Sequence, residues 1–180
     1  MIGGDYSVYV NGDSQTIGTD LNENGASYPY HLVQLMGGNI IANPAIGGAC
    51  IDRILRTTNQ YLDDCERNDR NLANNVDDAF PDFVIIGWTE YSRYDWFYNG
   101  KLRTANAELD GLGPDETHLE KNVARTAWQN FHLSNHANAV GQIAYYYNQM
   151  MNLHERLKYL KIPHLFLNAH AGFYDYYGAE

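Results

Sequence analysis

The stretch VYVNGDSQTIG, Val8–Gly18, contains a strand pattern followed by a turn pattern, and this combination indicates the fold. Its first residues are β-branched or aromatic, which predicts a short strand over Tyr6–Val10. The Gly12-Asp13-Ser14 tripeptide that follows consists of turn-forming residues and is expected to open a polar loop. The stretch therefore predicts a strand whose carboxyl end leads directly into a turn that carries a serine.

The next segments alternate between helix and strand patterns. Ser27 is a good N-cap for a helix with Pro29 in its first turn, and Gly37-Gly38 is a stop signal. Its predicted apolar side comprises Leu32, Val33, Leu35 and Met36. A strand is expected at Asn39–Ala42, and a second amphipathic helix of about three turns is expected from Ile51.

The second half of the chain predicts two further strands and the longest helix. FVIIGW, Phe83–Trp88, is the most apolar β-branched run and indicates a central buried strand. The polar region 65–82 is interpreted as a loop that can contain one helical turn, and region 91–129 as a long connection without clear periodicity. A long helix is expected before Pro163. The predicted apolar face of this helix comprises Val140, Ile143, Ala144, Tyr147, Met150, Met151, Leu157 and Leu160. A fourth strand is expected at His164–His170.

Strands that alternate with helices predict right-handed βαβ units, a mainly parallel sheet and helices on both of its faces. The expected fold class is therefore α/β, a three-layer αβα sandwich. No repeat or low-complexity linker divides residues 1–180, so we expect one domain. Ligands of such folds bind at the carboxyl ends of the strands, where the sequence places Gly12–Ser14, Gly47–Gly48 and Gly87–Glu90.

The charged side chains are acidic in balance. The chain has 22 Asp and Glu residues against 12 Lys and Arg residues, a net charge of −10. Because phosphate contacts need a basic face, this balance argues against a nucleic-acid partner. Fifteen tyrosines supply side chains that are common at protein interfaces, although a mixture of core and surface rings is the simpler interpretation.

No stretch suggests a membrane or secretory segment. No apolar run approaches the ~20 residues that span a bilayer. The N-terminal MIGGDYSVYV has neither a basic region nor an apolar stretch of about 7–15 residues, so we expect no signal peptide and a cytoplasmic location. Cys50 and Cys65 do not make a disulfide framework and are expected to be reduced, with Cys50 packed in the interior.

The position of Ser14 gives the Gly-Asp-Ser turn a chemical interpretation. A serine just past a strand can present its hydroxyl at the sheet edge, with backbone N–H groups nearby to stabilise an oxyanion. Asp13 can brace the turn through its side chain. Gly47-Gly48 precedes a helix at the same edge, which makes the Gly48 N–H a candidate donor. The alternative is that both are ordinary turns.

The order of three motifs resembles blocks I, II and III of the SGNH/GDSL hydrolase superfamily, which has a flavodoxin-like fold. The motifs are NGDSQT from Asn11, NPAIGGA from Asn43 and VIIGWTE from Val84. The likeness is greatest to phage-encoded members, in which Gly-Ala is followed by a short polar stretch and DRI. It covers the order of elements from Val8 to Asn168.

This resemblance implies an ester hydrolase with Ser14 as its nucleophile. The N–H groups of Ser14 and Gly48 would be two oxyanion donors, Thr89 stands where the family has a donor Asn, and Glu90 stands where Asp is usual. The implied substrate is a small ester, such as an acetylated carbohydrate. No metal and no organic cofactor is implied.

The end of the chain departs from the family pattern. The family's catalytic Asp and His form an Asp-x-x-His motif after the last strand, before a closing helix. AHAGFYDYYGAE, which follows Asn168, lacks this motif and offers His170 and Asp175 in reverse order. Three explanations stay open: a fragment, His170 as a substitute base, or a non-catalytic structural or binding protein, as in a phage virion.

Several other residues have both a chemical and an ordinary interpretation. His132 and His136 are spaced to share a helical face and could ligate zinc, but surface or capping histidines are the favoured account. Arg93 follows the third strand and could bind a substrate or a neighbouring chain, or pack on Tyr91 and Trp96. His154 is expected to face solvent from the long helix.

Overall fold

The computed structural model describes residues 6–18, 27–71, 80–89, 93–98, 101–105, 126, 130 and 139–168. The helices and strands follow one another as β1 (Tyr6–Asn11), α1 (Ser14–Ile17), α2 (Tyr28–Met36), β2 (Gly38–Ala42), α3 (Ile51–Asn71), β3 (Phe83–Trp88), β4 (Tyr94–Tyr98), β5 (Lys101–Ala105), α5 (Ala139–Tyr159) and β6 (His164–Asn168).

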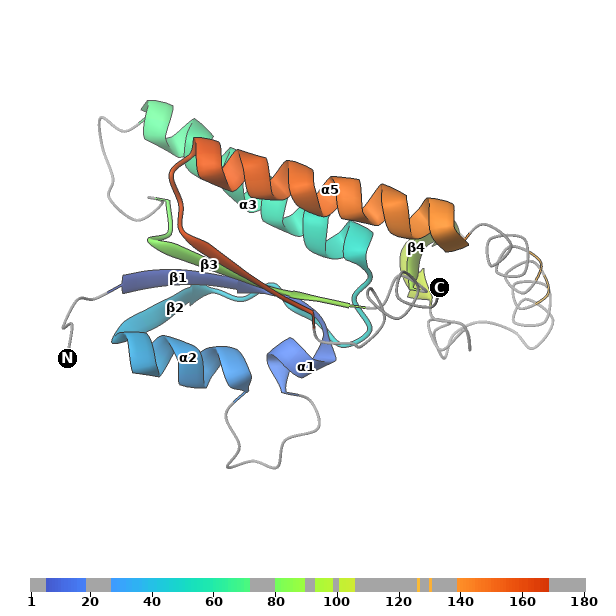
Figure 1. The fold of residues 1–180 in the computed structure, drawn as a ribbon, viewed down its shortest axis with the longest axis horizontal. Coiled ribbons are helices and arrows are strands. Elements are labelled where there is room, and N and C mark those ends of the chain that lie inside the picture. Colours follow the sequence, from blue (N-terminus) through green and yellow to red (C-terminus); the bar gives the residue numbers. More distant parts are fainter. Residues whose placement is uncertain are drawn as a thin grey trace, which may run out of the picture.

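Four parallel strands form the central sheet in the order β2-β1-β3-β6 (Figure 1). The protein therefore has an α/β fold, as the sequence predicts, and all four expected strands are confirmed. After β1 the chain adds β2 on one side and β3 on the other. In doubly wound sheets this reversal marks the place where ligands bind, at the carboxyl ends of the strands.

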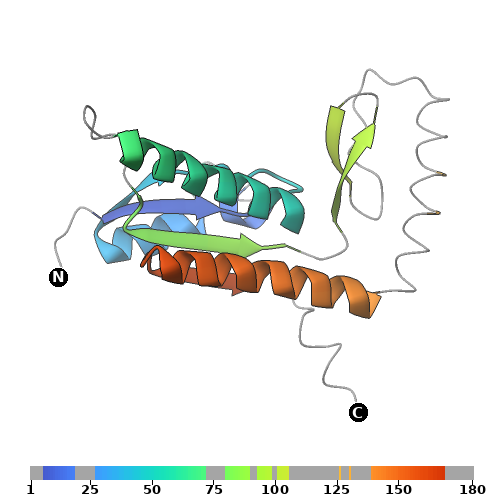
Figure 2. The same cartoon turned by 90° about the horizontal axis from the view of Figure 1, so that it is seen from above.

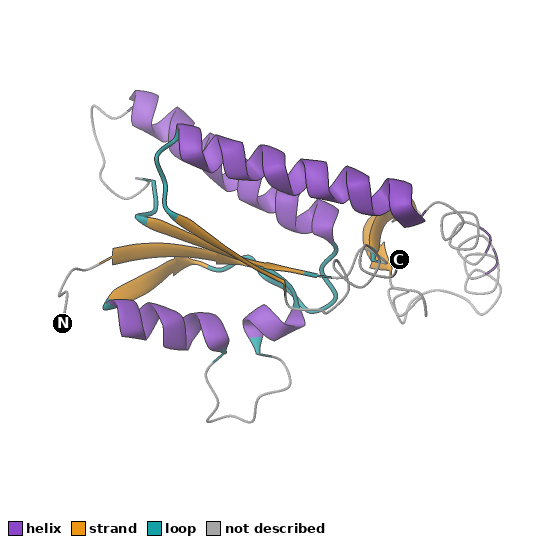
Figure 3. Cartoon of the chain, viewed as in Figure 1, coloured by secondary structure: helices purple, strands orange, loops and turns teal. Residues whose placement is uncertain are grey.

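Helices lie on both faces of this sheet (Figures 1 and 3). Alternate residues of β1 face opposite sides, as the pleat requires. Tyr9 packs in one core cluster with residues of α3 and α5, whereas Val8 and Val10 pack in another with Val33 of α2. The two clusters anchor the helices of each face and hold the carboxyl end of β1 between them.

Helix α2 has the expected limits, but its apolar side is smaller than predicted. Ser27 is its N-cap residue, and Gly37, at φ 73°, ends it in a left-handed conformation. Val33 is 1% exposed, whereas Leu35 is 85% exposed. The prediction for Leu35 is wrong because apolar spacing on a short helix does not determine how far the core extends around it.

Helix α3 is 21 residues long, twice the predicted length. The interpretation of region 65–82 as a loop is wrong up to Asn71. The last turns are polar because they face α5 instead of the sheet: Arg156 donates hydrogen bonds to Asn59 Oδ1 at 2.8 Å, Asp63 Oδ1 at 2.6 Å and Glu66 Oε1 at 3.0 Å. Cys65 in the same segment is buried.

Helix α5 has the expected position but presents a partly different face. Ile143, Met150 and Leu157 are buried as predicted, and so are Tyr146 and Leu153, which the predicted stripe omits. Two other members of that stripe, Tyr147 and Met151, are 58% and 38% exposed. The buried face of α5 is determined by its contact with α3, where the Tyr146 hydroxyl donates a hydrogen bond to Asp52 Oδ2 at 3.0 Å.

An antiparallel hairpin, β4–β5, lies within the region predicted to be a long connection. It stands apart from the four-stranded sheet, beyond the carboxyl end of β3 (Figure 2). The signal was present in the sequence: Asn99-Gly100 separates the two strands, and Asn-Gly is the strongest short hairpin signal.

Cys50 and Cys65 are both buried, as expected for Cys50, and the two do not form a disulfide bond. Within the described ranges, neither long helix combines the length and the apolar character that crossing a membrane would require.

Candidate active site at the carboxyl edge of the sheet

A buried polar network holds the end of β1 in place. The Asn11 side chain is 1% exposed. Its Oδ1 accepts from the Gly12 N–H at 2.8 Å, and its Nδ2 lies 2.8 Å from Thr57 Oγ1 and 2.9 Å from Thr58 Oγ1 on α3. The start of the Gly-Asp-Ser turn is therefore anchored to α3, a role for Asn11 that the sequence analysis missed.

Tyr9 completes this network. Its hydroxyl donates to Thr58 Oγ1 at 3.3 Å, and its ring stacks on Tyr61 with centroids 4.4 Å apart. Burial raises the pKa of Tyr9 to about 12, although its hydrogen bonds with Thr58 and Asn11 lower that pKa. The folded state therefore holds the Tyr9 proton more tightly than the unfolded chain does.

This difference predicts a loss of stability in strong base. The contribution of Tyr9 is fully present below pH 10 and is lost as the pH rises through about 12. We expect the free energy of unfolding to fall by up to roughly 2–3 kcal/mol over this range. Urea titrations at pH 9 to 12 measure it, and Tyr9→Phe should flatten the slope. Tyr6→Phe, exposed on the same strand, is the matched control, and equal slopes in both variants would contradict the assignment.

Asp13 is the centre of the turn. Its side chain is fully buried and caps α1, with Oδ1 accepting from the Gln15 N–H at 3.1 Å. Its Oδ2 accepts from Thr89 Oγ1 at 3.0 Å and from Arg93 Nη1 at 3.3 Å. The prediction that Asp13 braces the turn is confirmed, and its partners join β1 to the residues that follow β3.

This arrangement argues against Thr89 as an oxyanion donor. A threonine hydroxyl has one hydrogen to donate, and the hydroxyl of Thr89 directs it to Asp13. Thr89 is itself fully buried. The predicted role is therefore corrected to a structural one, in which Thr89 fixes the carboxylate that precedes Ser14.

Arg93 is an ion-pair partner of Asp13, and its side chain is 17% exposed. The sequence analysis proposed that it binds a substrate or packs on Tyr91 and Trp96. Tyr91 lies outside the described residues, and the Trp96 side chain is likewise not described. The contact with Asp13 nevertheless links the start of the β4–β5 hairpin to the Gly-Asp-Ser turn.

Ser14 is the first residue of α1 and is half-buried. The expected polar loop therefore begins with one helical turn, because Asp13 caps it and Gly18, at φ 80°, ends it. A Cβ built on Gly47 would lie 4.0 Å from Ser14 Cβ, an ordinary van der Waals contact. The structure thus brings the first two predicted sites, Ser14 and Gly47-Gly48, together.

Gly48 occupies a conformation that favours glycine, with φ +74°. It is exposed, and within the described ranges its N–H donates no hydrogen bond to another backbone group. Gly47, the preceding residue, lies beside Ser14, so the Gly48 amide is a candidate donor to a ligand at this edge. Its role as the second oxyanion donor stays a prediction.

Two glycines, Gly12 after β1 and Gly87 in β3, allow the ends of these two strands to approach each other closely. A methyl group on Gly12 would collide with Thr16 and with the Gly87 carbonyl oxygen, and one on Gly87 would collide with Thr16 and the Tyr28 hydroxyl. Thr16 is fully buried and hydrogen-bonds Tyr28 at 3.1 Å. The β1 and β3 ends can meet at this distance because neither residue has a side chain.

Gly87→Ala tests this close approach. We expect it to lower the free energy of unfolding by about 1–3 kcal/mol, because Thr16 and Tyr28 must both move. Chemical denaturation measures the change. Gly47→Ala is the matched control, since its methyl group meets Ser14 only at an ordinary contact distance. Equal effects of the two substitutions would contradict the collision.

The remaining predicted site residues fall outside the described residues: Glu90, His132, His136, His170 and Asp175. Within the described part of the chain, no group of three or more His, Cys, Asp or Glu side chains could hold a metal ion.

His154 does not face solvent as predicted but is half-buried, with 35% of its side chain exposed. Its Nδ1 lies 2.7 Å from His164 Nε2, and His164 Nδ1 lies 3.0 Å from the Ile162 carbonyl oxygen. A carbonyl only accepts, so His164 Nδ1 is the donor there. With both rings neutral, His164 Nε2 accepts from His154 Nδ1, which leaves His154 Nε2 as an acceptor.

Comparison of the chain with protein-family models, with curated proteins and with solved structures found no match. The resemblance of the three motifs to SGNH/GDSL hydrolases therefore enters below as part of a proposal.

Proposed function

We propose that the protein is a serine ester hydrolase of the SGNH/GDSL type, with Ser14 as its nucleophile and a small ester, such as an acetylated carbohydrate, as its substrate. The observation that carries the proposal is the proximity of Gly47 to Ser14, since a Cβ built on Gly47 would lie 4.0 Å from Ser14 Cβ. It joins two motifs 33 residues apart in the chain at the edge where the strand order reverses.

In the proposed reaction Ser14 Oγ attacks the acyl carbon of the ester, and a histidine takes the hydroxyl proton. The N–H groups of Ser14 and Gly48 stabilise the oxyanion. The histidine then protonates the departing alcohol, and water hydrolyses the acyl-serine. His170 is the candidate base. Asp13 positions Ser14 by fixing the turn, since its carboxylate binds Gln15, Thr89 and Arg93.

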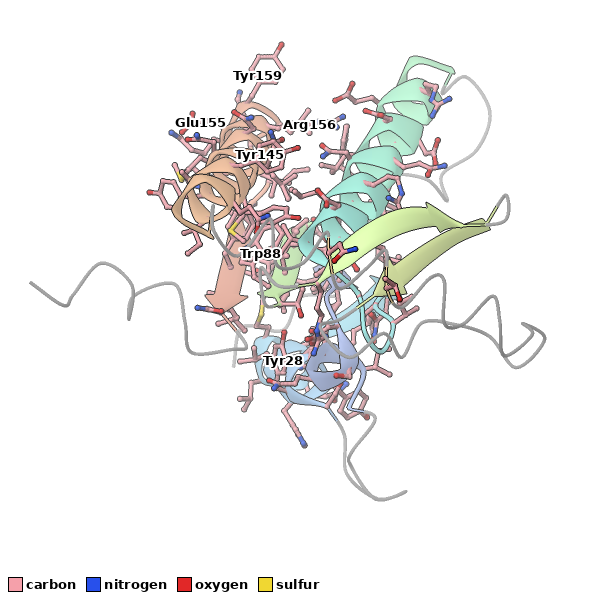
Figure 4. The ribbon with its side chains drawn as sticks, turned by 90° about the vertical axis from the view of Figure 1, so that its right-hand side faces the viewer. Tyr28, Trp88, Tyr145, Glu155, Arg156 and Tyr159 are labelled. Carbon is pink, nitrogen blue, oxygen red and sulfur yellow. The ribbon has the colours of Figure 1, made fainter. Side chains whose placement is uncertain are left out.

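A second candidate function is a non-catalytic SGNH-like structural or binding protein, such as a phage virion component. The specific observation in its favour is the engagement of Thr89 by Asp13, which removes one donor from the proposed oxyanion site. Loss of one such donor can cost about 10²–10³ in turnover. Two tyrosines exposed on α5, Tyr145 and Tyr159, would then supply a surface for a protein partner (Figure 4).

Covalent labelling distinguishes the two functions. An alkyl fluorophosphonate reacts when an activated serine oxygen displaces fluoride from phosphorus, with the proton passing to the base. We expect one equivalent of label on the peptide that contains Ser14, identified by mass spectrometry, and hydrolysis of p-nitrophenyl acetate that the label abolishes. A folded protein that neither takes the label nor hydrolyses the ester would exclude the enzyme and favour the binding protein.

A further inference from the structure

A cavity of about 660 Å³ lies between α5 and the strands β3 and β6. Its lining residues are Trp88, Ile143, Ala144, Tyr147, Asn148, Met150, Met151, His154, Phe166 and Asn168. This volume is within the range of small-molecule sites, which is roughly 300–1,000 Å³. The cavity is thus large enough for a substrate group of several carbon atoms.

The lining favours an uncharged, apolar occupant. Trp88 and Phe166 meet edge to face with centroids 5.2 Å apart, and Met150 and Met151 supply flexible side chains that adapt to a ligand's shape. No Asp, Glu, Lys or Arg is among the described residues that line it. A charged ligand would lose its hydration there without gaining an ionic partner.

The cavity reaches the same edge of the sheet as Ser14. Asn168, the last residue of β6, pairs with Trp88, the last residue of β3. The next residue, Thr89, hydrogen-bonds Asp13, which precedes Ser14. Adjacent strands lie about 4.8 Å apart, so the row that runs from β1 across β3 to β6 at this edge spans roughly 10 Å. Figure 4 looks onto this edge, with Trp88 beneath α5 and Tyr28 on the α2 side.

We propose that this cavity binds the apolar, uncharged part of the ester that Ser14 cleaves. This inference rests on the proposed function and narrows its substrate: among small esters, those with an alkyl or aromatic acyl group of several carbons are the better substrates, and acetyl esters, the example given above, are the poorer ones. A hexanoyl chain that starts at Ser14 would be directed along this row towards Trp88, the residue of β3 that lines the cavity. Each buried methylene then adds to binding, as transfer from water to an apolar site requires.

Two variants on α5 test the proposal. Ala144→Phe places a ring in the cavity from an exposed helical position, so we expect it to fold. Asn152→Phe adds the same ring at an exposed position of the same helix that does not line the cavity. Both are made in the Ser14→Ala background for binding and in the wild-type background for hydrolysis, and circular dichroism checks their folding.

Isothermal titration calorimetry of Ser14→Ala with p-nitrophenyl hexanoate and p-nitrophenyl acetate measures binding without turnover. We expect the hexanoate to bind at least about tenfold more tightly, given ~0.8 kcal/mol for each buried methylene. Ala144→Phe should remove this preference and Asn152→Phe should retain it. Equal binding of the two esters, or a preference that survives Ala144→Phe, overturns the proposal.

Hydrolysis separates this inference from the proposed function. In the wild-type background we expect the ratio of kcat/KM for hexanoate to that for acetate to exceed ten, and to fall in Ala144→Phe only. If the hexanoate binds in the cavity but neither ester is hydrolysed, the proposed function is wrong and the ligand class of the cavity stands. If both esters are hydrolysed at equal rates, the function stands and the inference fails.

Discussion

Ser14→Ala is expected to lower ester hydrolysis by at least about 10³-fold while leaving the fold intact. Alanine removes the oxygen that attacks the acyl carbon, and the oxyanion donors and the base cannot replace it. The serine is the first residue of α1 and not its cap, which is Asp13, so the loss of its hydroxyl should cost little stability. Hydrolysis of p-nitrophenyl esters and thermal unfolding measure the two effects.

Ser7→Ala is the control for this substitution. Ser7 lies near the amino end of β1, where its hydroxyl hydrogen-bonds Asp82 at 2.8 Å, at the opposite edge of the sheet. It should retain full activity. Hydrolysis that survives in Ser14→Ala would show that another group performs the attack, and the Gly-Asp-Ser turn would then be architecture only.

Asp13→Ala is expected to lower the free energy of unfolding by about 2–4 kcal/mol. The substitution removes the cap of α1 and leaves the Thr89 hydroxyl and the mostly buried Arg93 guanidinium without the carboxylate that they share. Because the same carboxylate fixes the turn, any hydrolysis by Ser14 should fall as well. Chemical denaturation and ester hydrolysis measure the two effects.

A surface ion pair supplies the matched control for Asp13. Asp64 pairs with Arg67 at 2.7 Å on α3, and both side chains are more than half exposed. Asp64→Ala should cost less than about 1 kcal/mol because water screens and replaces this contact. Similar costs for the two substitutions would contradict the central role of Asp13.

The strands of the sheet could be predicted because their signals are local. Val8 to Val10 and Val84 to Trp88 are buried, and most of these positions are β-branched or aromatic. The length of α3 could not be predicted, because its polar end is stabilised by Arg156, more than 90 residues away in the chain. The buried face of α5 depends on the same contact between helices.

Part of the site could also be predicted. The place of Ser14 after β1 and of Gly47-Gly48 before α3 follows from turn chemistry at strand and helix ends. The partners of Asp13 do not, because Thr89 and Arg93 lie 76 and 80 residues further along the chain. The cavity behind Trp88 had no sequence signal either, because no local pattern distinguishes its lining residues from other side chains of the same helix and strands.

The sequence by itself determined the alternation of strands and helices, the turn that carries Ser14 and the place of the Gly47-Gly48 pair before a helix. These features depend on backbone preferences and apolar periodicity within a few residues. Only the tertiary structure decided that Thr89 donates to Asp13, that Gly47 lies beside Ser14 and that an apolar cavity opens at the same edge. These features arise because the folded sheet brings segments that are distant in the chain to one edge, and backbone preferences within a few residues do not fix such contacts.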